Sequence, residues 1–240
     1  MSRDSLNACM LPPMALEQRT HPRTSEAIAA VELRDAILRG DLAPGTKIRQ
    51  EATAAQLGIS LIPVREALKT LAAEGIVTYH PQRGYFVTEL PATAVADIYV
   101  VRELIESQTE ELALPRLTEQ NLADMSRHLR DQARAVDEQD AVEMIATNRR
   151  FHFVIFDHCE NIWLNRFVAQ LWDTLDPYRV LSYRRMWLHD PDRHVPAEIL
   201  NEHERILNAL QRDDGEQALT LLQRHRERSE TFIETLVNRA

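Results

Sequence analysis

Three histidines and an asparagine have the residue types and the spacing of a transition-metal site. Asn148 and His152 are four residues apart, so they share one face of a helix. His203 and His225 each lie eleven residues from a turn expected near Asp214, so an antiparallel helix pair would place both at one height. At a rise of about 1.5 Å per residue, that height is roughly 16 Å from the turn. Three imidazoles and one amide oxygen could bind a divalent transition metal (Zn²⁺, Ni²⁺ or Mn²⁺) and leave positions open for water or a ligand.

The spacing leaves a second interpretation open, because a histidine in an amphipathic helix is often polar surface or a hydrogen-bonded core residue. The position of nearby carboxylates also matters, since a hydrolytic metalloenzyme needs a carboxylate base beside an open metal position. Glu202 and Glu204 flank His203, so we expect both carboxylates to point away from its face. A metalloenzyme and a metal sensor are therefore the alternatives to a site that binds a regulatory ligand.

The charge of the chain divides near residue 90. Of 240 residues, 28 are basic and 37 acidic, and this net charge of −9 by itself disfavours binding to phosphate. Residues 1–90 nevertheless balance ten basic against ten acidic residues, so the acidic excess belongs to residues 91–240. Five of the six glycines precede residue 85, which indicates tight turns in front and long helices behind. We expect a mobile N-terminal arm (residues 1–22), a first domain (residues 23–90) and a second domain (residues 91–240).

The composition disfavours several other protein classes. A hydrophobic content of 44% supports packed cores rather than a disordered chain. No apolar stretch is long enough to span a bilayer, so we expect no membrane partner. Cys9 and Cys159 are too far apart in sequence to form a typical metal or redox pair, which suits a reducing compartment. We therefore expect a cytoplasmic protein.

The first domain has the pattern of a winged helix-turn-helix. A helix capped at Thr24 or Ser25 is followed, after a turn, by helices expected over residues 50–57 and 61–74. Pro63 falls in the first turn of the last helix, where a missing N–H is harmless. Two β-rich runs, residues 76–79 and 85–88, predict a small β-hairpin.

The second domain has the pattern of an all-α antiparallel helix bundle, so the expected fold class is mainly α. Ile98, Val101, Ile105 and Leu112 form one apolar stripe, which predicts a helix that ends near Pro115. Further helices are expected over residues 117–138, 141–158, 162–181, 196–211 and 216–239. The longest connection, at about residues 186–195, is predicted to be a mobile cover over a cavity.

Residues that could contact DNA gather at the start of the last helix of the first domain and at the hairpin tip. In a helix-turn-helix, the second helix enters the major groove and its first turn reaches base edges. Ser60 can cap that helix and donate to a phosphate, and Arg65 can reach a phosphate or a guanine. An ion pair of Arg65 with Glu66 or Glu51 is the alternative. The candidate contacts are Arg49, Ser60, Leu61, Arg65, Gln82, Arg83 and Gly84, with Lys69 adding nearby positive charge.

Several segments of the first domain resemble the DNA-binding domain of the GntR family, in order and with the expected spacing over about residues 25–90. They are Gly40-Asp41-Leu42-Ala43-Pro44-Gly45, Leu57-Gly58-Ile59-Ser60, Pro63-Val64-Arg65-Glu66-Ala67-Leu68, Glu74-Gly75-Ile76-Val77 and Arg83-Gly84-Tyr85-Phe86-Val87. The segment from Pro63 to Leu68 resembles the FadR-like branch, which carries an all-helical FCD effector domain. The resemblance implies a homodimeric repressor or activator that reads a short palindromic operator in double-stranded DNA.

The second domain resembles the FCD domain in Phe151-His152, Glu202-His203 and His225, within about residues 95–235. Because the FCD pattern places its metal on Asp-x-x-x-His and two later histidines, the resemblance strengthens the metal-site interpretation. Asn148 departs from this pattern, since it stands where the aspartate is expected. An asparagine supplies a carbonyl oxygen but no charge. We expect weaker metal binding, which argues against a pure metal sensor, and a site that attracts an anionic ligand.

These features predict a transcription regulator whose operator affinity is controlled by a small carboxylate metabolite. The carboxylate would coordinate the metal, and Arg102, at the border of the apolar stripe, could pair with it. An ion pair of Arg102 with Glu106, four residues on, is the alternative. Ligand binding would change the spacing or mobility of the two DNA-binding domains of a dimer through residues 89–93.

A further departure from the family pattern lies at the start of the helix that would enter the groove. The family often has Ser-Arg-Thr before Pro-Val-Arg, whereas this chain has Ser60-Leu61-Ile62. Leu61 replaces a base-reading arginine with an apolar side chain that can meet a thymine methyl group or pack internally. We expect an altered or relaxed base preference, with a larger role for Arg65 and the hairpin.

Overall fold

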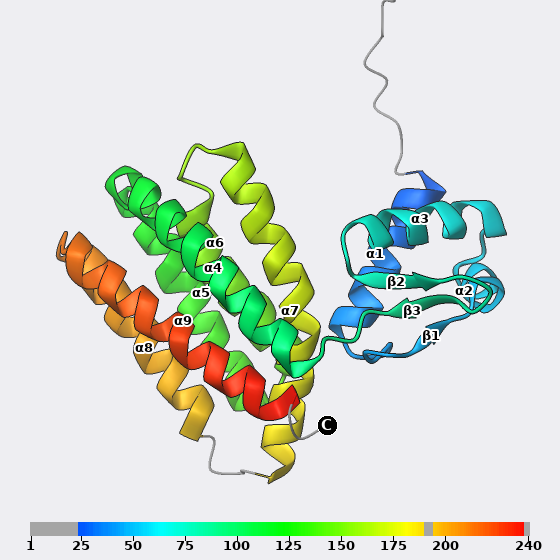
Figure 1. Cartoon of the computed structure of the whole chain (residues 1–240). Helices are drawn as coiled ribbons and strands as arrows, with labels where there is room; N and C mark the ends of the chain where they lie inside the picture. The colour runs from blue at the N-terminus through cyan, green and yellow to red at the C-terminus, as the bar shows by residue number, and fades with distance from the viewer. Residues whose placement is uncertain (1–23, 190–193, 238–240) are drawn as a thin grey trace, which may run out of the picture.

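The structure is a computed structural model that describes residues 24–189 and 194–237. It has a front unit, α1 to β3, and a helical rear bundle, α4 to α9 (Figure 1). The predicted fold class, mainly α with a winged helix-turn-helix and a helix bundle, is confirmed. The arm expected at residues 1–22 lies outside the described residues. Within the described ranges, no helix combines the length and the apolar character needed to cross a membrane.

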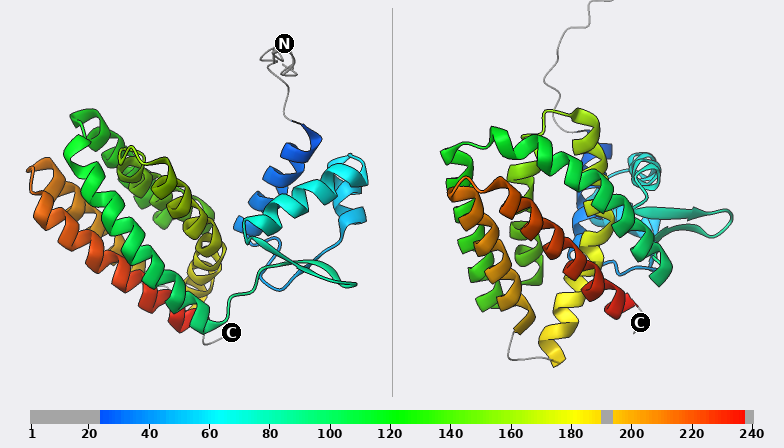
Figure 2. Two further views of the ribbon diagram at one scale, coloured as in Figure 1. Left: turned by 45° about the horizontal axis from the view of Figure 1, so that its top comes forward. Right: turned by 60° about the vertical axis from the view of Figure 1, so that its left-hand side comes forward.

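The front unit packs helices against a three-stranded antiparallel sheet. Its elements are α1 (Ser25–Leu38), β1 (Lys47–Ile48), α2 (Gln50–Leu57), α3 (Leu61–Ala73), β2 (Val77–His80) and β3 (Gly84–Val87). The middle strand, β3, pairs with β2 through the predicted hairpin and also with β1. Sequence analysis missed β1, because two residues are too few to show an alternating pattern. Figure 2 shows the β2–β3 hairpin projecting away from the rear bundle.

Local signals in the sequence explain where the front helices begin and end. Thr24 caps α1 by accepting a hydrogen bond from the backbone N–H of Ala27. Gly58, with φ at 66°, adopts the left-handed conformation that ends α2 and starts the turn into α3. The inward face of α3 is fully apolar and carries the core contacts of the unit, through Val64, Ala67, Leu68 and Leu71.

The rear bundle consists of long helices, most of them connected by short turns. Its elements are α4 (Ala92–Ala113), a short 3₁₀ turn (Leu114–Arg116), α5 (Glu119–Glu138), α6 (Ala141–Phe156), α7 (Ile162–His189), α8 (His194–Gln211) and α9 (Gly215–Val237). Because α7 continues to His189 and α8 begins at His194, most of the cover predicted at residues 186–195 is helical. The remainder, residues 190–193, lies outside the described residues.

The buried face of α4 differs from the predicted apolar stripe. Val101 is 41% exposed, whereas Arg102 and Glu106, which periodicity assigns to the border, are buried. Arg102 donates two hydrogen bonds to Glu106, so the two charges satisfy each other inside the bundle. A pattern of apolar residues cannot reveal a buried face that is held by ion pairs.

One helix of the rear bundle, α7, contacts the front unit directly. The hydroxyl of Tyr178 accepts a hydrogen bond from the N–H of Leu90 at 2.5 Å and donates one to the carbonyl of Thr88 at 3.0 Å. Arg34 of α1 bonds to Asp173 of α7 at 3.2 Å. The segment that leaves the sheet and enters α4 is therefore held against α7.

Candidate functional site

The three histidines of the predicted metal site meet in the interior of the rear bundle. His152 lies on α6, His203 on α8 and His225 on α9. Nε2 of His203 lies 3.1 Å from Nε2 of His152 and 3.3 Å from Nε2 of His225. One nitrogen from each ring lies within 4.8 Å of the other two, and the rings of His152 and His203 are buried. The structure thus brings together three potential ligands from three helices.

Two hydrogen bonds determine which nitrogen of these rings carries the proton. Nδ1 of His203 lies 2.7 Å from Oε1 of Gln132, and Nδ1 of His225 lies 2.8 Å from Oε2 of Glu202. Amide and carboxylate oxygens accept hydrogen bonds, so each Nδ1 donates, and when the ring is neutral this tautomer leaves the lone pair on Nε2. The lone pairs of His203 and His225 therefore converge, and a bound cation would stabilise that arrangement.

Burial favours the neutral form of the buried rings. It lowers the pKa of His152 and of His203 well below the ordinary histidine value, and neighbouring imidazoles lower it further. A neutral imidazole with a free Nε2 is the form that binds Zn²⁺ and similar metals. Outer hydrogen bonds such as those that the rings donate to Gln132 and Glu202 also orient metal-binding rings and raise their basicity. The chemistry of this donor set fits a divalent transition metal.

The expectation that Glu202 points away from the cluster is wrong. Its carboxylate binds His225 on the next helix and also accepts from Arg228 at 2.5 Å. Glu202 can do so because it meets a ring on α9 rather than the histidine beside it on α8. Burial raises the pKa of Glu202, but His225 and Arg228 outweigh it and hold that pKa below its usual value. Glu204 is exposed, as expected.

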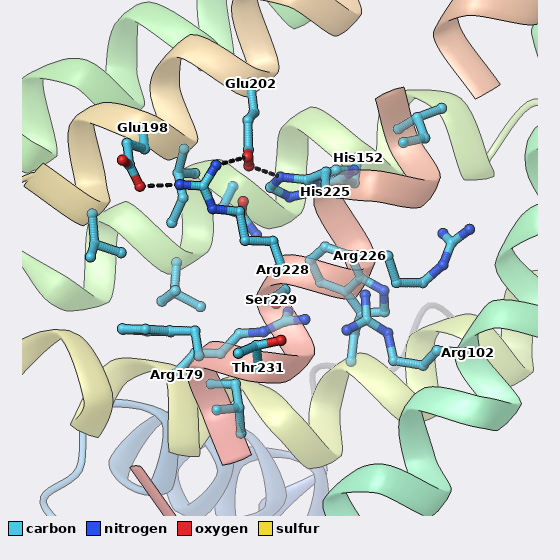
Figure 3. Close-up of a pocket in the computed structure, with 18 of the residues that line it drawn as sticks. Arg102, His152, Arg179, Glu198, Glu202, His225, Arg226, Arg228, Ser229 and Thr231 are labelled. Carbon is cyan, nitrogen blue, oxygen red and sulfur yellow. Dashed lines mark hydrogen bonds and ion pairs between the residues drawn. The ribbon is translucent and has the colours of Figure 1, made fainter. Parts of the chain in front are cut away.

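The rear bundle encloses a cavity of about 250 Å³ (Figure 3). Asn148 lies on its wall. The side chains of His152 and His225 line the same cavity. Asn148 is only 8% exposed and stands one turn before His152 on α6, so the two side chains share one face of that helix. The rest of the wall combines apolar side chains with four arginines and four glutamates. The apolar side chains include Met144, Ile145, Trp172, Ile199, Leu222 and Phe232, and the charged ones are Arg102, Arg179, Arg226, Arg228, Glu106, Glu110, Glu198 and Glu202. The cavity can enclose a small molecule beside the histidines.

Arg102 reaches the same cavity in the ion pair with Glu106 that the sequence offered as the alternative. Nε and Nη2 of Arg102 donate to the two oxygens of Glu106 at 2.6 and 3.1 Å. Nη1 of Arg102 is buried and has no hydrogen-bond partner among the described residues. Burial raises the pKa of Glu106, yet Arg102 and Arg226 outweigh it and lower that pKa, which keeps the carboxylate charged. The Nη1 amino group of Arg102, which carries two N–H donors, is left for a ligand.

Arg179 is a second buried guanidinium on the cavity wall, and sequence analysis missed it. It extends from α7, opposite Arg102 on α4 (Figure 3). Both guanidinium carbons lie over the Trp172 ring, at 4.5 Å for Arg179 and 5.0 Å for Arg102. The His152 ring is 5.2 Å from the same indole. Nε of Arg179, like Nη1 of Arg102, is buried without a partner among the described residues.

Arg226 is the centre of a buried ionic network between α9 and α4. It donates to Glu103 at 2.7 Å and to Glu106 and Glu110 at 3.0 Å each. Burial raises the pKa of Glu110 to about 7, although Arg226 opposes the shift. Sequence analysis missed this network too, because each member alone resembles an ordinary surface charge.

In the front unit, the residues predicted to contact DNA at the start of α3 are exposed, apart from Leu61. Ser60 is the N-cap residue, but its hydroxyl makes no cap hydrogen bond, contrary to one of its two predicted roles. Nε of Arg65 donates to Gln50 at 3.1 Å, so its partner is neither Glu66 nor Glu51. Glu66 is instead paired with Lys69 at 2.8 Å. Leu61 is half-buried and packs against the core of the unit.

The remaining predicted DNA contacts lie at the hairpin tip and at the start of α2. Gln82 and Gly84 have φ at 64° and 95°, which makes the tight turn between β2 and β3. Arg83, between them, is exposed, and its guanidinium lies 5.3 Å from the centre of the Phe86 ring. Arg49 is exposed at the N-cap of α2. The sequence-predicted residues of the front unit thus occupy two separate places, the α2–α3 pair and the hairpin tip.

Comparison with known protein families and proteins agrees with this architecture. The family model described as "Bacterial regulatory proteins, gntR family" matches residues 24–87, and that described as "FCD domain" matches residues 97–228. A transcriptional regulator of the Nta operon from Aminobacter aminovorans is 30% identical over 162 residues, which cover 67% of this chain and 77% of that protein. The uncharacterized HTH-type transcriptional regulator YdhC from Bacillus subtilis (strain 168) is 27% identical over 188 residues, covering 78% and 81%.

Solved structures share the fold at lower sequence identity. McbR/YncC from E. coli superposes with a TM-score of 0.76 and 24% identity, covering 88% of this chain and 97% of that one. The structure of a GntR transcriptional regulator from Rhodococcus sp. RHA1 gives a TM-score of 0.73 at 22% identity, covering 87% of this chain and 96% of that one. The FCD match alone spans more than half of the chain. The chain therefore belongs to the GntR family of bacterial regulatory proteins, with an FCD domain, and is a DNA-binding transcriptional regulator.

Proposed function

We propose that the affinity of this regulator for a palindromic operator is controlled by a small carboxylate metabolite, bound together with a divalent metal in the cavity of the rear bundle. The observation that carries the proposal is the composition of that cavity. Converging imidazole nitrogens lie on its wall, and two guanidinium groups with unpartnered N–H donors face it as well. A carboxylate can coordinate a metal that the imidazoles hold, and it can accept hydrogen bonds from the guanidinium groups.

The metal would be held by His152, His203, His225 and the carbonyl oxygen of Asn148. Because all four donors are neutral, none of them would offset the charge of a bound metal. An anionic ligand compensates this charge, so metal and carboxylate are expected to bind cooperatively. Arg102 and Arg179 would orient the carboxylate through Nη1 and Nε, which are buried and unpartnered among the described residues.

Helix α7 supplies a direct connection between the cavity and the front unit. Trp172 and Arg179 lie on the cavity wall. Asp173 and Tyr178, on the same helix, bond to α1 and to the segment between β3 and α4. A ligand that shifts α7 would therefore change the contacts that hold the front unit. Control of DNA affinity requires such contacts to differ between the ligand-bound and ligand-free states. In this proposal, residues 89–93 and α7 together transmit ligand binding to the DNA-binding unit.

A palindromic operator requires two copies of the chain, and α4 offers a surface for pairing. Its outward side exposes Val100, Val101 and Leu104, with exposed fractions of 61%, 41% and 70%. These residues lie close together on one helix, and burying them against a second copy would stabilise a dimer. We therefore include a homodimer through α4 in the proposal.

The nearest carboxylate to the cluster does not favour the metalloenzyme alternative. Glu202 accepts hydrogen bonds from His225 and Arg228, so both partners compete with any proton transfer from water to this carboxylate. A general base needs a free lone pair directed at the reacting water. Glu202 is better suited to orient His225 and to add negative charge near the metal.

The test measures metal content, stabilisation by organic acids and operator binding, all on the full chain. The purified protein is expected to hold a divalent metal that His203→Ala and Asn148→Ala reduce and that the control His158→Ala does not. Thermal-shift screening of organic acids with Zn²⁺, Ni²⁺ or Mn²⁺ should find one that stabilises the protein, by roughly 2.7 kcal/mol at a hundredfold excess over Kd. That acid should change operator retention in a gel-shift assay. Full metal content in the His203 variant, or DNA binding indifferent to every stabilising acid, would refute the proposal.

A further inference from the structure

The outward face of α3 combines an apolar side chain with two cations. Ile62, Arg65 and Lys69 are spaced three and four residues apart, so they share one side of the helix, and all three are exposed. The opposite side is the apolar core face. Ile62 is 71% exposed, which is unusual for an isoleucine in the first turn of a packed helix. Lys69 is paired with Glu66, whereas Arg65 bonds only to the neutral Gln50 among the described residues. Arg65 therefore gives Ile62 a cationic neighbour that suits a phosphate.

The two apolar residues that depart from the family pattern have different surroundings. Leu61 is half-buried and packs against the core of the front unit. Ile62 projects into solvent and is not among the described residues that pack against that core. The thymine-methyl contact considered for Leu61 therefore suits Ile62 better, since only Ile62 presents its apolar surface outward.

Ile62 also has the right position for a base contact. It is the second residue of α3, and in a helix-turn-helix the first turn of the second helix reaches base edges in the major groove. The exposed hydroxyl of Ser60, which makes no cap hydrogen bond, and the guanidinium of Arg65 flank it with groups that suit phosphate. In that groove, the apolar group that distinguishes one base from the others is the C5 methyl of thymine.

We propose that Ile62 determines part of the operator sequence by packing against the C5 methyl group of a thymine in each half-site. This inference rests on DNA binding by α3 and goes beyond the proposed function, because it names the base and the chemical group that are read. Leu61 then serves the fold, and Arg65 fixes the position of the helix on the backbone.

The experiment uses the full chain and an operator selected from random duplexes. Each thymine of the half-site is replaced in turn by deoxyuridine, which pairs identically and lacks only the methyl group. One replacement is expected to weaken wild-type binding about three- to tenfold, in line with an apolar base contact of about 1 kcal/mol. Ile62→Ala should bind the thymine and deoxyuridine duplexes equally. The control Ile28→Ala removes an exposed isoleucine of α1 and should keep the wild-type discrimination.

Each outcome decides the inference. A wild-type protein indifferent to every deoxyuridine, a selected half-site without thymine, or an Ile62→Ala variant that still discriminates would overturn the methyl contact while DNA binding itself stands. Failure of the wild type to retain any duplex would instead refute DNA binding by α3, and the inference with it. Because Ile62 is exposed, its alanine variant is expected to keep the wild-type melting temperature, which checks that any loss is local.

Discussion

The two parts of the molecule use arginine in opposite settings. In the front unit, Arg49, Arg65 and Arg83 are exposed, on a surface that a large polyanion can approach. In the rear bundle, Arg102, Arg179 and Arg226 are only 3–4% exposed and are paired with carboxylates. The first arrangement suits a phosphate backbone that arrives from solvent. The second suits a small anion that the protein can enclose.

The difference shows why the net charge says little about either site. Exposed charges are screened by salt over about 10 Å, so front-unit binding is expected to depend strongly on ionic strength. Buried charges interact in a medium of low dielectric constant, and an unpaired one is costly. The rear bundle must therefore balance its arginines with acidic residues, and part of its acidic composition serves that purpose.

The largest expected effect comes from removing the central charge of the rear network. Arg226→Met leaves Glu106 and Glu110 buried without their shared partner. We expect the free energy of unfolding to fall by about 3–5 kcal/mol, measured by urea denaturation. The control Arg228→Met alters a half-exposed arginine of the same helix and should cost about 1 kcal/mol or less. Equal losses in the two variants would remove the contrast between buried and exposed arginines.

The next effect is a pH dependence that arises from Glu110. Burial raises its pKa from 4.5 to about 7 in the folded protein. Between these values the unfolded chain releases the proton first, so the free energy of unfolding falls as pH rises. Glu110→Gln has no carboxyl group to ionise, so its unfolding free energy lacks this fall with pH. The difference in unfolding free energy, variant minus wild type, should therefore increase by on the order of 3 kcal/mol between pH 4.5 and 7. The exposed Glu111→Gln is the control, and a parallel pH profile for Glu110→Gln would contradict the assignment.

A smaller effect, on metal affinity, is expected from Glu202, which contacts a proposed metal ligand, His225, rather than the metal itself. Glu202→Gln keeps an oxygen for Nδ1 of His225 but removes the charge, so metal affinity should fall about 10-fold, within the usual range of about 10–100-fold for such partners. Titration with Zn²⁺ against a competing chelator measures it, with Glu204→Gln as control. In the opposite direction, Asn148→Asp adds a charged ligand and should tighten binding. Unchanged affinity in both variants would contradict a metal at this cluster.

The smallest change in stability is expected at the exposed arginine of α3. Arg65→Met should leave the free energy of unfolding within about 0.5 kcal/mol, because the side chain is exposed. Operator affinity should nevertheless fall about tenfold, and the slope of log K against log salt should decrease by about one. The control Arg130→Met removes an exposed arginine of α5, and a similar loss of DNA affinity there would refute a specific role for Arg65.

The front unit was largely predictable because its site lies on the outside of an ordinary apolar core. Glycine positions, the Pro63 first turn and two β-rich runs located its helices and hairpin. The sequence could not distinguish the surroundings of Leu61 and Ile62, since both are apolar and adjacent. Their separation depends on the rotation of α3 against the core, which only the structure shows.

The rear bundle was predictable in its helices and in the convergence of its histidines, but less so in its charged cavity wall. The equal distances of His203 and His225 from one turn placed them together, because helix geometry is regular. Gln132 and Glu202 were missed or misplaced, since they meet partners on other helices. Arg179 was missed because its ion pair with Asp176 on the same helix resembles an ordinary surface pair. Their roles depend on helix packing, for which a single helix sequence holds no signal.

The central claim is that a ligand in the rear cavity controls DNA binding by the front unit, and thermodynamic linkage tests it directly. Calorimetry would measure the affinity of the metal-loaded protein for the most stabilising carboxylate, with and without operator DNA. The account predicts that the operator changes this affinity by the same factor by which the acid changes operator affinity, within a typical range of about 5–150-fold. Tyr178→Phe, which loosens the contact between α7 and the front unit, should reduce both factors equally. A carboxylate affinity that operator DNA leaves unchanged would contradict the account.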